Sequence, residues 1–285
     1  MVPWYLKIPM KMVLARLPVP RSLFNRLGVF RHGGMRRPDY ALEIVQRHTA
    51  FAHVDLARKH VLELGPGDSV GNGIVAYALG ARSTCLVDAG DWATRDLDVY
   101  RAFVRWLDTA LPDPTRLREA GTDWADFDGL LRAFNMRYLT GGLAALRGLP
   151  SQSIDYCFSE AVLEHIRVHE FHLSMVELQR VLRPGGIASH TIDYKDHLQA
   201  SLNNMRVSRE RWESPLFSAS GFYTNRLRHS DVMASFQRAG LQTVREERMH
   251  WAALPMKRSC VHAQLRGYTD ADLRVHEAFV VLRVP

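Results

Sequence analysis

Residues 61–69 read VLELGPGDS, and this stretch decides the fold that the sequence predicts. The run from His60 to Leu64 is short and mostly apolar, as in a buried strand. Gly65 and Gly67 then allow a sharp turn, so a ligand can approach the backbone N–H groups of the helix that follows. An enzyme that binds a dinucleotide would have a third glycine at position 70, where this chain has Val70. The nicotinamide fingerprint therefore fails at its last position.

Outward from this turn, strands and helices alternate along the chain. A helix-like segment ends near Gly80, and the next strand runs from Ser83 to Asp88, which completes a βαβ unit. Helical periodicity is also found at about 38–52, at 175–182, and from an expected N-cap at Ser230 to Gly240. Apolar strand-like runs follow at 136–139, 154–159, 187–192, 243–247 and 278–284. The alternation predicts an α/β fold with a mainly parallel sheet.

Two carboxylates flank the glycine turn. Asp88 lies at the end of the second strand, 21 residues beyond Gly67, where a carboxylate can accept both ribose hydroxyls of an adenosine. Glu63, in the first strand, lies where it could hold a cationic amine rather than a pyrophosphate. The alternatives are a helix N-cap for Asp88 and a purely structural strand-to-helix turn for the glycines.

Four segments in this order resemble the class I S-adenosylmethionine-dependent methyltransferases. Residues 63–67 (ELGPG) resemble the first motif of that family, and Asp88 its ribose-binding acid. Residues 153–166 (SIDYCFSEAVLEHI) resemble the fourth-strand motif, and 180–186 (RVLRPGG) the turn before the fifth strand. The longer pattern of GPGDS at 65–69 and DYKDH at 193–197 also resembles methyltransferases of bacterial cell-surface glycan biosynthesis. The resemblance to the class I family covers about residues 58–195. It implies a Rossmann-like, seven-stranded, mainly parallel sheet with helices on both faces and an antiparallel last strand.

The resemblance also implies S-adenosyl-L-methionine as the cofactor and the residues that hold it. These residues lie in the first turn and after the second, third and fourth strands: Glu63, Gly65, Pro66, Gly67, Ser69, Asp88, Ala89, Gly142 and Ser159. Ser69 stands where many members have a third glycine. No acid follows the third strand, so Thr140 or residues 141–143 would have to meet the adenine amine, if any residue does.

Methyl transfer is an in-line displacement at carbon, so the protein must align the acceptor and, for a hydroxyl acceptor, remove a proton. Glu160, just past the fourth strand, could supply the base. The cluster DYKDH at 193–197, after the fifth strand, could do so as well. Within it we favour His197 as the base, with Asp193 or Asp196 orienting it or the sugar hydroxyls. A carboxylate base is the alternative.

Residues 222–228 (FYTNRLR) mix aromatic, amide and guanidinium side chains. Proteins grip sugars by stacking and hydrogen bonds, and phosphates by arginine forks. We therefore expect Tyr223, Asn225, Arg226 and Arg228 to bind the acceptor; packing of the loop onto the core is the rival interpretation. The resulting hypothesis is an O-methyltransferase that acts on a sugar or glycoside hydroxyl, in surface polysaccharide biosynthesis.

Other functions stay open as alternatives. One is a small-molecule natural-product methyltransferase with the same cofactor; others are a nicotinamide-dependent oxidoreductase and a membrane-recruited adaptor with an inactive methyltransferase fold. His165, His169 and His172 fall at helical spacing, which could suit a metal. However, HEFH at 169–172 is one residue short of the HExxH zinc pattern, so we favour a solvated helix face and expect no metal.

The sequence predicts two regions: a basic helical N-terminal extension at 1–57 and a methyltransferase domain at 58–285. Within the domain we expect a helical insertion at about 92–135, as core packing or a cap, and a substrate-side insertion at about 195–229. Residues 1–60 hold eleven Lys and Arg against three acids, a net +8, while the whole chain has +7. An amphipathic helix within 4–23 could bring this basic segment to an anionic membrane. The rivals are a solvated face and a segment that closes over the cofactor pocket.

The remaining features of the sequence indicate the cellular compartment and the kinds of partner. The three cysteines are isolated, with no CxxC pair, which is typical of a reducing compartment. We find no signal-peptide pattern and no run of 18 apolar residues, so we expect a cytoplasmic protein, peripheral at the inner membrane face. The basic residues match no nucleic-acid-binding module, so we expect a small-molecule or sugar acceptor and no nucleic acid. An oligomer is left open.

Overall fold

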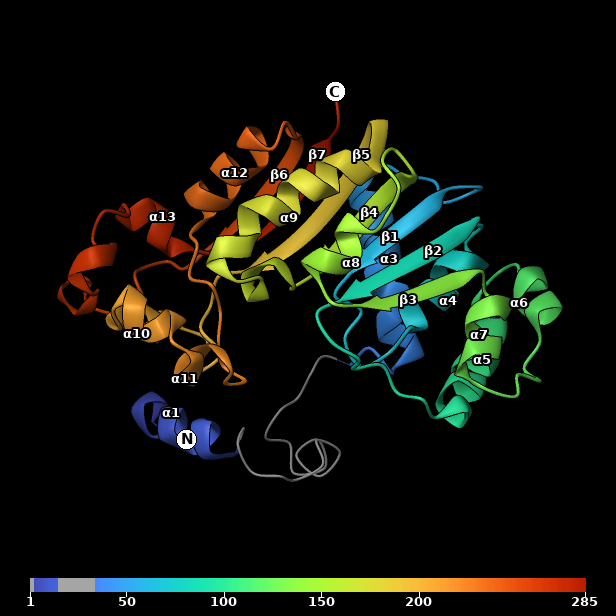
Figure 1. Ribbon diagram of the computed structural model, residues 1–285, viewed down its shortest axis with the longest axis horizontal. Helices are drawn as coiled ribbons and strands as arrows, with labels where there is room; N and C mark the ends of the chain where they lie inside the picture. The colour runs from blue at the N-terminus through green and yellow to red at the C-terminus, as the bar shows by residue number, and fades with distance from the viewer. Residues whose placement is uncertain (1–2, 15–33) are drawn as a thin grey trace.

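The computed structural model describes residues 3–14 and 34–285. A seven-stranded sheet organises these residues, and its course can be followed in Figure 1. The strand order is β3-β2-β1-β4-β5-β7-β6. Strand β7 pairs antiparallel with both β5 and β6, and every other pair is parallel, so the predicted fold class is confirmed. The strands are β1 (His60–Leu64), β2 (Ser83–Asp88), β3 (Met136–Thr140), β4 (Ile154–Glu160), β5 (Leu182–Asp193), β6 (Gln242–His250) and β7 (Val275–Arg283).

Strand β5 begins earlier than the sequence predicts. The expected start was residue 187, after the Pro-Gly-Gly turn, but the strand already begins at Leu182, which pairs with Ile154. The register shifts before the next pair, so the turn is a bulge inside the strand. Gly185 has a φ of +75° there, and its N–H donates to the carbonyl of Val284.

Helices cover both faces of the sheet (Figure 1). On one face, α3 (Pro38–Ala52), α4 (Gly71–Ala78) and α5 (Leu97–Ala110) share an apolar core with β1 and β2. On the other, α8 (Leu143–Arg147), α9 (Val168–Val181) and α12 (His229–Arg238) pack over β4, β5 and β7. Helix α3 places Ala41, Ile44 and Val45 in the first core, so this part of the predicted extension packs as part of the domain.

The expected N-cap of α12 is wrong. The helix begins at His229, and its N-cap is Arg228, whose backbone N–H donates to the carboxylate of Asp231. The hydroxyl of Ser230 instead donates to Asp272, a residue 42 positions further along. A tertiary contact therefore takes the serine side chain that the sequence had suggested as a local cap.

The helical insertion consists of α5, α6 (Thr115–Ala120) and α7 (Phe127–Ala133). Helix α5 buries one face against α4. The side chains of Tyr100, Phe103 and Leu107 on this face are at most 1% exposed. These residues recur at the helical spacing that the sequence shows, so the insertion packs onto the core. Of the two roles expected for it, core packing is the one that these contacts support.

A second, smaller layer lies beyond the sheet, where two long connections meet. One follows β5 and contains η2 (Asn203–Arg206), α10 (Arg209–Glu213) and α11 (Pro215–Ser218). The other follows β6 and contains η3 (Arg258–Cys260), η4 (Ala263–Leu265) and α13 (Asp270–Arg274). Because β5 and β6 run in the same direction, both connections leave the carboxyl edge of the sheet, where ligands bind in such folds. Their apolar side chains form two small clusters of their own.

The N-terminal helix α1 (Trp4–Leu14) lies beside α10 and α11 (Figure 1). Trp4, Ile8 and Met12 pack against the cluster around Trp212. The expected amphipathic helix is thus observed over its first part. The basic residues Arg16, Arg21, Arg26 and Arg31, and the rest of the predicted 4–23 stretch, lie outside the described residues.

Within the described ranges, every helix is too short or too polar to cross a bilayer.

Candidate active site

The two glycines of the turn after β1 need their glycine identity for different reasons. Both have a φ of +69°, in the region that side chains rarely adopt. A Cβ on Gly65 would lie 2.4 Å from Cγ2 of Val162, so the turn packs directly against the segment after β4. A Cβ on Gly67 would meet no atom within 4 Å. The space above Gly67 is therefore open, as a ligand that lies across the turn requires.

We expect Gly65→Ala to lower the free energy of unfolding by about 2–5 kcal/mol. The left-handed backbone costs roughly 1–2 kcal/mol and the overlap with Val162 adds roughly 1–3 kcal/mol. Gly67→Ala has the same backbone angle without the overlap, so it should lose only the first part while obstructing the space above the turn. Urea unfolding of both variants measures the difference. Equal losses would contradict the role given to Val162.

Asp88 connects the glycine turn to the end of β2. Its Oδ2 accepts a hydrogen bond from the N–H of Gly67 at 2.9 Å, and its Oδ1 one from the N–H of Ala89 at 2.6 Å. Its backbone carbonyl accepts from the N–H of Gly142 at 2.8 Å. Burial raises the pKa of the Asp88 carboxyl, against the hydrogen bonds that favour its charged form. The structure thus brings together the residues predicted from three separate segments.

Glu63 lies buried beneath the same turn. Its Oε1 accepts from Nδ2 of Asn72 at 2.6 Å, while its Oε2 has no hydrogen-bond partner among the described residues. Burial raises the pKa of Glu63 to about 8. A buried carboxylate oxygen without a partner costs free energy, and a cationic ligand group would offset that cost.

The side chains of two predicted cofactor-binding residues are engaged inside the protein. The Ser69 hydroxyl accepts the N–H of Gly71 at 3.0 Å, and that of Ser159 pairs with Nδ1 of His190 at 2.7 Å. Both serines are at most 1% exposed, and each buried hydroxyl has a hydrogen-bond partner inside the protein. Pro66 is also buried, so the turn offers a ligand its backbone rather than these side chains.

The segment before α3 reaches the glycine turn, which sequence reasoning missed. Nε of Arg36 lies 3.0 Å from Oδ2 of Asp68, and Nδ2 of Asn72 lies 3.9 Å from the sulfur of Met35. These contacts favour the rival interpretation in which part of the N-terminal segment closes over the cofactor side. The sequence had left such a closure open beside an anionic or a solvated surface, but it did not single out Met35 or Arg36.

Glu160, at the end of β4, is held by helix α3. Its Oε2 lies 2.6 Å from the Arg47 guanidinium and 3.1 Å from Nε2 of the buried His48. Burial raises the pKa of Glu160, but the hydrogen bond from His48 and the charge of Arg47 outweigh it, so the net shift is downward. A carboxylate held in its charged form by two partners is a weak base. His48 lies on the buried i, i+3, i+4 face of α3, a signal that could have found it.

The acids expected to orient His197 point elsewhere. Asp196 accepts three backbone N–H groups with its two oxygens, from Leu198, Gln199 and Asn203, and is 2% exposed. Asp193 pairs with the Lys195 ammonium at 3.1 Å. Both carboxylates therefore shape the loop after β5 through these contacts.

His197 instead meets residues that follow β4. Its ring centre lies 4.9 Å from that of His165, and the two histidines and Glu164 bring ligand atoms within 4.8 Å of one another. Glu164 is 4% exposed, and neither of its oxygens has a hydrogen-bond partner among residues 3–14 and 34–285. This cluster of one carboxylate and two imidazoles lies at the carboxyl ends of β4 and β5.

The predicted helical face with three histidines is wrong. His165 lies in a 3₁₀ turn, η1 (Leu163–His165), because Arg167 adopts an extended backbone and α9 begins only at Val168. His169 is exposed, and Nδ1 of His172 lies 3.3 Å from the Ser235 hydroxyl. Only His165 of the three joins the cluster with His197.

The residues expected to bind the acceptor are all buried, which favours the rival packing interpretation: Tyr223, Asn225, Arg226 and Arg228. Nδ2 of Asn225 donates to the carbonyls of Leu163 and Ile166. Arg226 donates to the carbonyls of Asn204 and Val207, and Arg228 to those of Tyr194 and Val275. The Tyr223 hydroxyl donates to Glu213. The arginine and amide groups of this loop thus satisfy backbone carbonyls.

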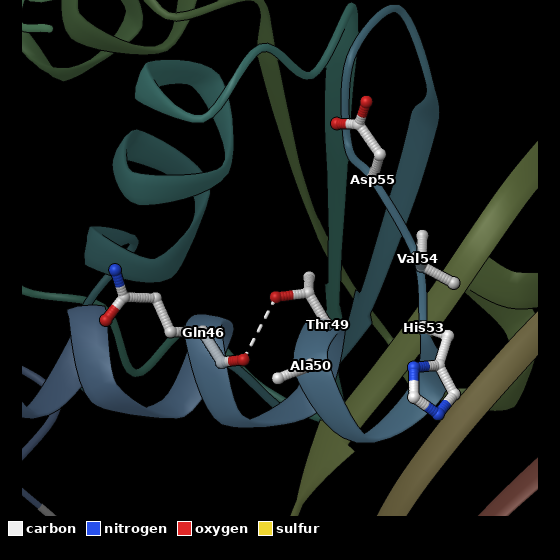
Figure 2. Close-up of a pocket in the computed structure, with 6 residues that line it drawn as sticks. All are labelled: Gln46, Thr49, Ala50, His53, Val54 and Asp55. Carbon is white, nitrogen blue, oxygen red and sulfur yellow. Dashed lines mark hydrogen bonds between the residues drawn. The ribbon is translucent and has the colours of Figure 1, made fainter.

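A shallow pocket lies at the end of α3, lined by Gln46, Thr49, Ala50, His53, Val54 and Asp55 (Figure 2). The Thr49 hydroxyl donates to the Gln46 carbonyl within it. The chain enters the amino end of β1 directly after this segment, so the pocket lies at the opposite edge of the sheet from the glycine turn. It is therefore separate from the candidate active site.

Residues 113–189 match the family model described as a methyltransferase domain. The matched segment includes β4, η1 and α9; it starts after Asp88 and stops before His197. None of the curated proteins matches this chain.

Several solved structures are similar to this chain. Geranyl diphosphate C-methyltransferase from Streptomyces coelicolor A3(2), in complex with Mg²⁺, geranyl-S-thiolodiphosphate and S-adenosyl-L-homocysteine, is 10% identical, with a TM-score of 0.50 over 85% of this chain and 75% of that one. An S-adenosylmethionine-dependent methyltransferase from Mesorhizobium loti is 14% identical, with a TM-score of 0.48 over 87% and 100%. The methyltransferase in complex with the Haloferax volcanii Trm112 activator is 16% identical, with a TM-score of 0.46 over 90% and 99%.

Proposed function

We propose that this chain, a methyltransferase whose cofactor is S-adenosylmethionine, methylates a hydroxyl oxygen of a sugar or glycoside in surface polysaccharide biosynthesis. The observation that supports a hydroxyl acceptor is the cluster of His197, His165 and Glu164 at the same sheet edge as the glycine turn. A hydroxyl must lose its proton near the moment of attack. His197 can act as the base itself, or it can bind another group that activates the hydroxyl.

The residues at the glycine turn fit this cofactor. The unpartnered oxygen of Glu63 suits a cationic amino group, Asp88 suits ribose hydroxyls, and the open space above Gly67 allows the ligand to lie close to the backbone. When bound, the cofactor supplies an activated methyl group. The domain match also favours methyl transfer over the nicotinamide-dependent reaction that the sequence had left open.

Mass spectrometry tests the acceptor class. The protein is incubated with S-adenosylmethionine and pooled nucleotide sugars, glycolipids and small natural products, and products one methyl group heavier are identified. Methylated sugars or glycolipids support the proposal. Methylation confined to natural products without sugars would replace it by the alternative of natural-product methylation.

We expect Asp88→Ala to weaken binding of S-adenosylmethionine by roughly 1.5–3 kcal/mol, the range for losing hydrogen bonds to a charged group. The same change removes the acceptor for the Gly67 N–H, so the turn itself also loses support. Isothermal titration calorimetry measures the affinity, and circular dichroism checks that the variant is folded. Unchanged affinity in a folded variant would remove Asp88 from the cofactor site.

We also propose that helix α1 contacts an anionic membrane. While one face of the helix packs inward, Tyr5, Leu6 and Met10 remain 56%, 51% and 43% exposed. Together with the net positive charge of residues 1–60, this face suits an anionic membrane that carries a lipid-linked acceptor.

We expect Leu6→Glu to weaken binding to anionic liposomes, measured by sedimentation, by about tenfold or more, because a buried leucine contributes roughly 1.5–3 kcal/mol. Val244, on β6, is 54% exposed and provides a matched control. Val244→Glu should leave sedimentation unchanged, and added salt should weaken it in every variant. An intact protein that ignores such liposomes even at low salt would show that α1 is only structural.

A further inference from the structure

We infer that Glu164, His165 and His197 form a binding site for a divalent transition-metal cation, with Zn²⁺ as the best match. Their ligand atoms already lie within 4.8 Å of one another. A Zn²⁺ ion about 2 Å from each of three ligands needs them roughly 3.3 Å apart, so small side-chain rotations would close the site. The three residues come from two different strand ends, which the fold brings together.

The environment of Glu164 is the strongest indication that a cation binds here. Its side chain is 4% exposed, and within the described part of the chain neither carboxylate oxygen accepts a hydrogen bond. Buried carboxylates are stable when paired or when they coordinate a metal. Arginine and lysine pair with two other acids at this edge, Glu160 and Asp193. The cationic side chain that would pair with Glu164 is replaced by two imidazoles, which bring their nitrogens close to its carboxylate.

His165 is prepared to act as a ligand. Its Nδ1 lies 3.2 Å from the carbonyl oxygen of Tyr223, so Nδ1 carries the proton and donates it there. That hydrogen bond leaves the lone pair on Nε2, as in histidines that bind metal through one nitrogen and are oriented through the other. The exposed His165 and half-buried His197 rings also leave the cluster accessible from solvent.

Asn225 stabilises the turn that carries Glu164 and His165. The backbone N–H of Asn225 donates to the carbonyl of Glu164 at 2.7 Å, and its side chain donates to two more carbonyls of the same turn. Asn225 and Tyr223 thus position the turn of Glu164 and His165. Supporting contacts of this kind accompany metal ligands.

The types of ligand atom determine which cation the site prefers. Two imidazoles and one carboxylate suit zinc and other first-row transition metals, whereas Mg²⁺ and Ca²⁺ prefer oxygen ligands throughout. Three protein ligands leave a fourth position open. If the proposed function is right, the acceptor hydroxyl takes that position, and His197 acts as a ligand instead of as a free base.

Calorimetric titration of Zn²⁺ into the metal-free, untagged full chain tests the site without cofactor or acceptor. We expect one ion per chain, and visible absorption bands of bound Co²⁺ as a second readout. Glu164→Gln, His165→Ala and His197→Ala should each weaken Zn²⁺ binding on the order of a hundredfold or more. His169→Ala, which removes an exposed histidine four positions from His165, should leave it unchanged.

Thermal unfolding provides the control for folding. Zn²⁺ should raise the Tm of the wild type and of His169→Ala, but not that of the three ligand variants. His165 and His197 are not buried, so their variants keep the test valid even if Glu164→Gln unfolds. Binding that is absent, or equal in the wild type and these two variants, overturns the inference. Zn²⁺ binding without sugar methylation would instead overturn only the proposed function.

Discussion

Alanine in place of His197 is expected to slow turnover about a hundredfold while leaving the affinity for S-adenosylmethionine within about twofold. Loss of a general base, or of a group that activates the acceptor, typically costs 10²–10⁴ in rate, and a hundredfold corresponds to about 2.7 kcal/mol. His197 follows β5, whereas the residues at the glycine turn follow β1, β2 and β3. Chemistry and cofactor binding should therefore respond separately.

Single-turnover rates and calorimetric cofactor titrations measure the two effects on the same preparations. His169→Ala is the matched control, because it removes an exposed histidine from the same edge and should change neither quantity. Wild-type turnover in a folded His197→Ala variant would remove His197 from the mechanism and shift attention to Asp193 and Glu160. A loss of cofactor affinity equal to the loss of rate would place His197 at the cofactor instead.

The fold around the glycine turn is predictable because its signals are local. Strands β1 and β2 begin and end at the expected residues, His60–Leu64 and Ser83–Asp88. Each is a short apolar run beside a turn, and burial of such a run on both faces leaves little choice of structure. The spacing of Asp88 from Gly67 was informative for the same reason, since the parallel strands place both at one sheet edge.

The candidate site depends on contacts that no local pattern reports. Glu160 is held by Arg47, 113 residues away, and the predicted extension thereby takes part in the site. His197 meets His165 because β4 and β5 are neighbours, while the adjacent Asp193 and Asp196 turn toward a lysine and the backbone. Sequence proximity suggested a cluster at residues 193–197, but the partners of His197 come from the neighbouring strand.

The largest loss of stability is expected from Arg228→Ala, a residue that the sequence had suggested for acceptor binding. Its side chain is 1% exposed and donates to the carbonyls of Tyr194, Asp272, Leu273 and Val275. Alanine would leave a cavity and several buried carbonyls without donors, which costs on the order of 3–5 kcal/mol. That is a large share of the 5–15 kcal/mol, roughly, that stabilises a domain.

Urea unfolding of Arg228→Ala and Arg238→Ala separates structural from charge effects. Arg238 lies on the same helix, α12, but is exposed, so its removal should change the free energy of unfolding by less than about 0.5 kcal/mol. The guanidinium of Arg228 joins the start of the loop after β5 to the junction of α13 and β7. Its loss should therefore loosen the loop that carries His197. An Arg228→Ala variant with wild-type stability and weakened acceptor binding would return this residue to the substrate site.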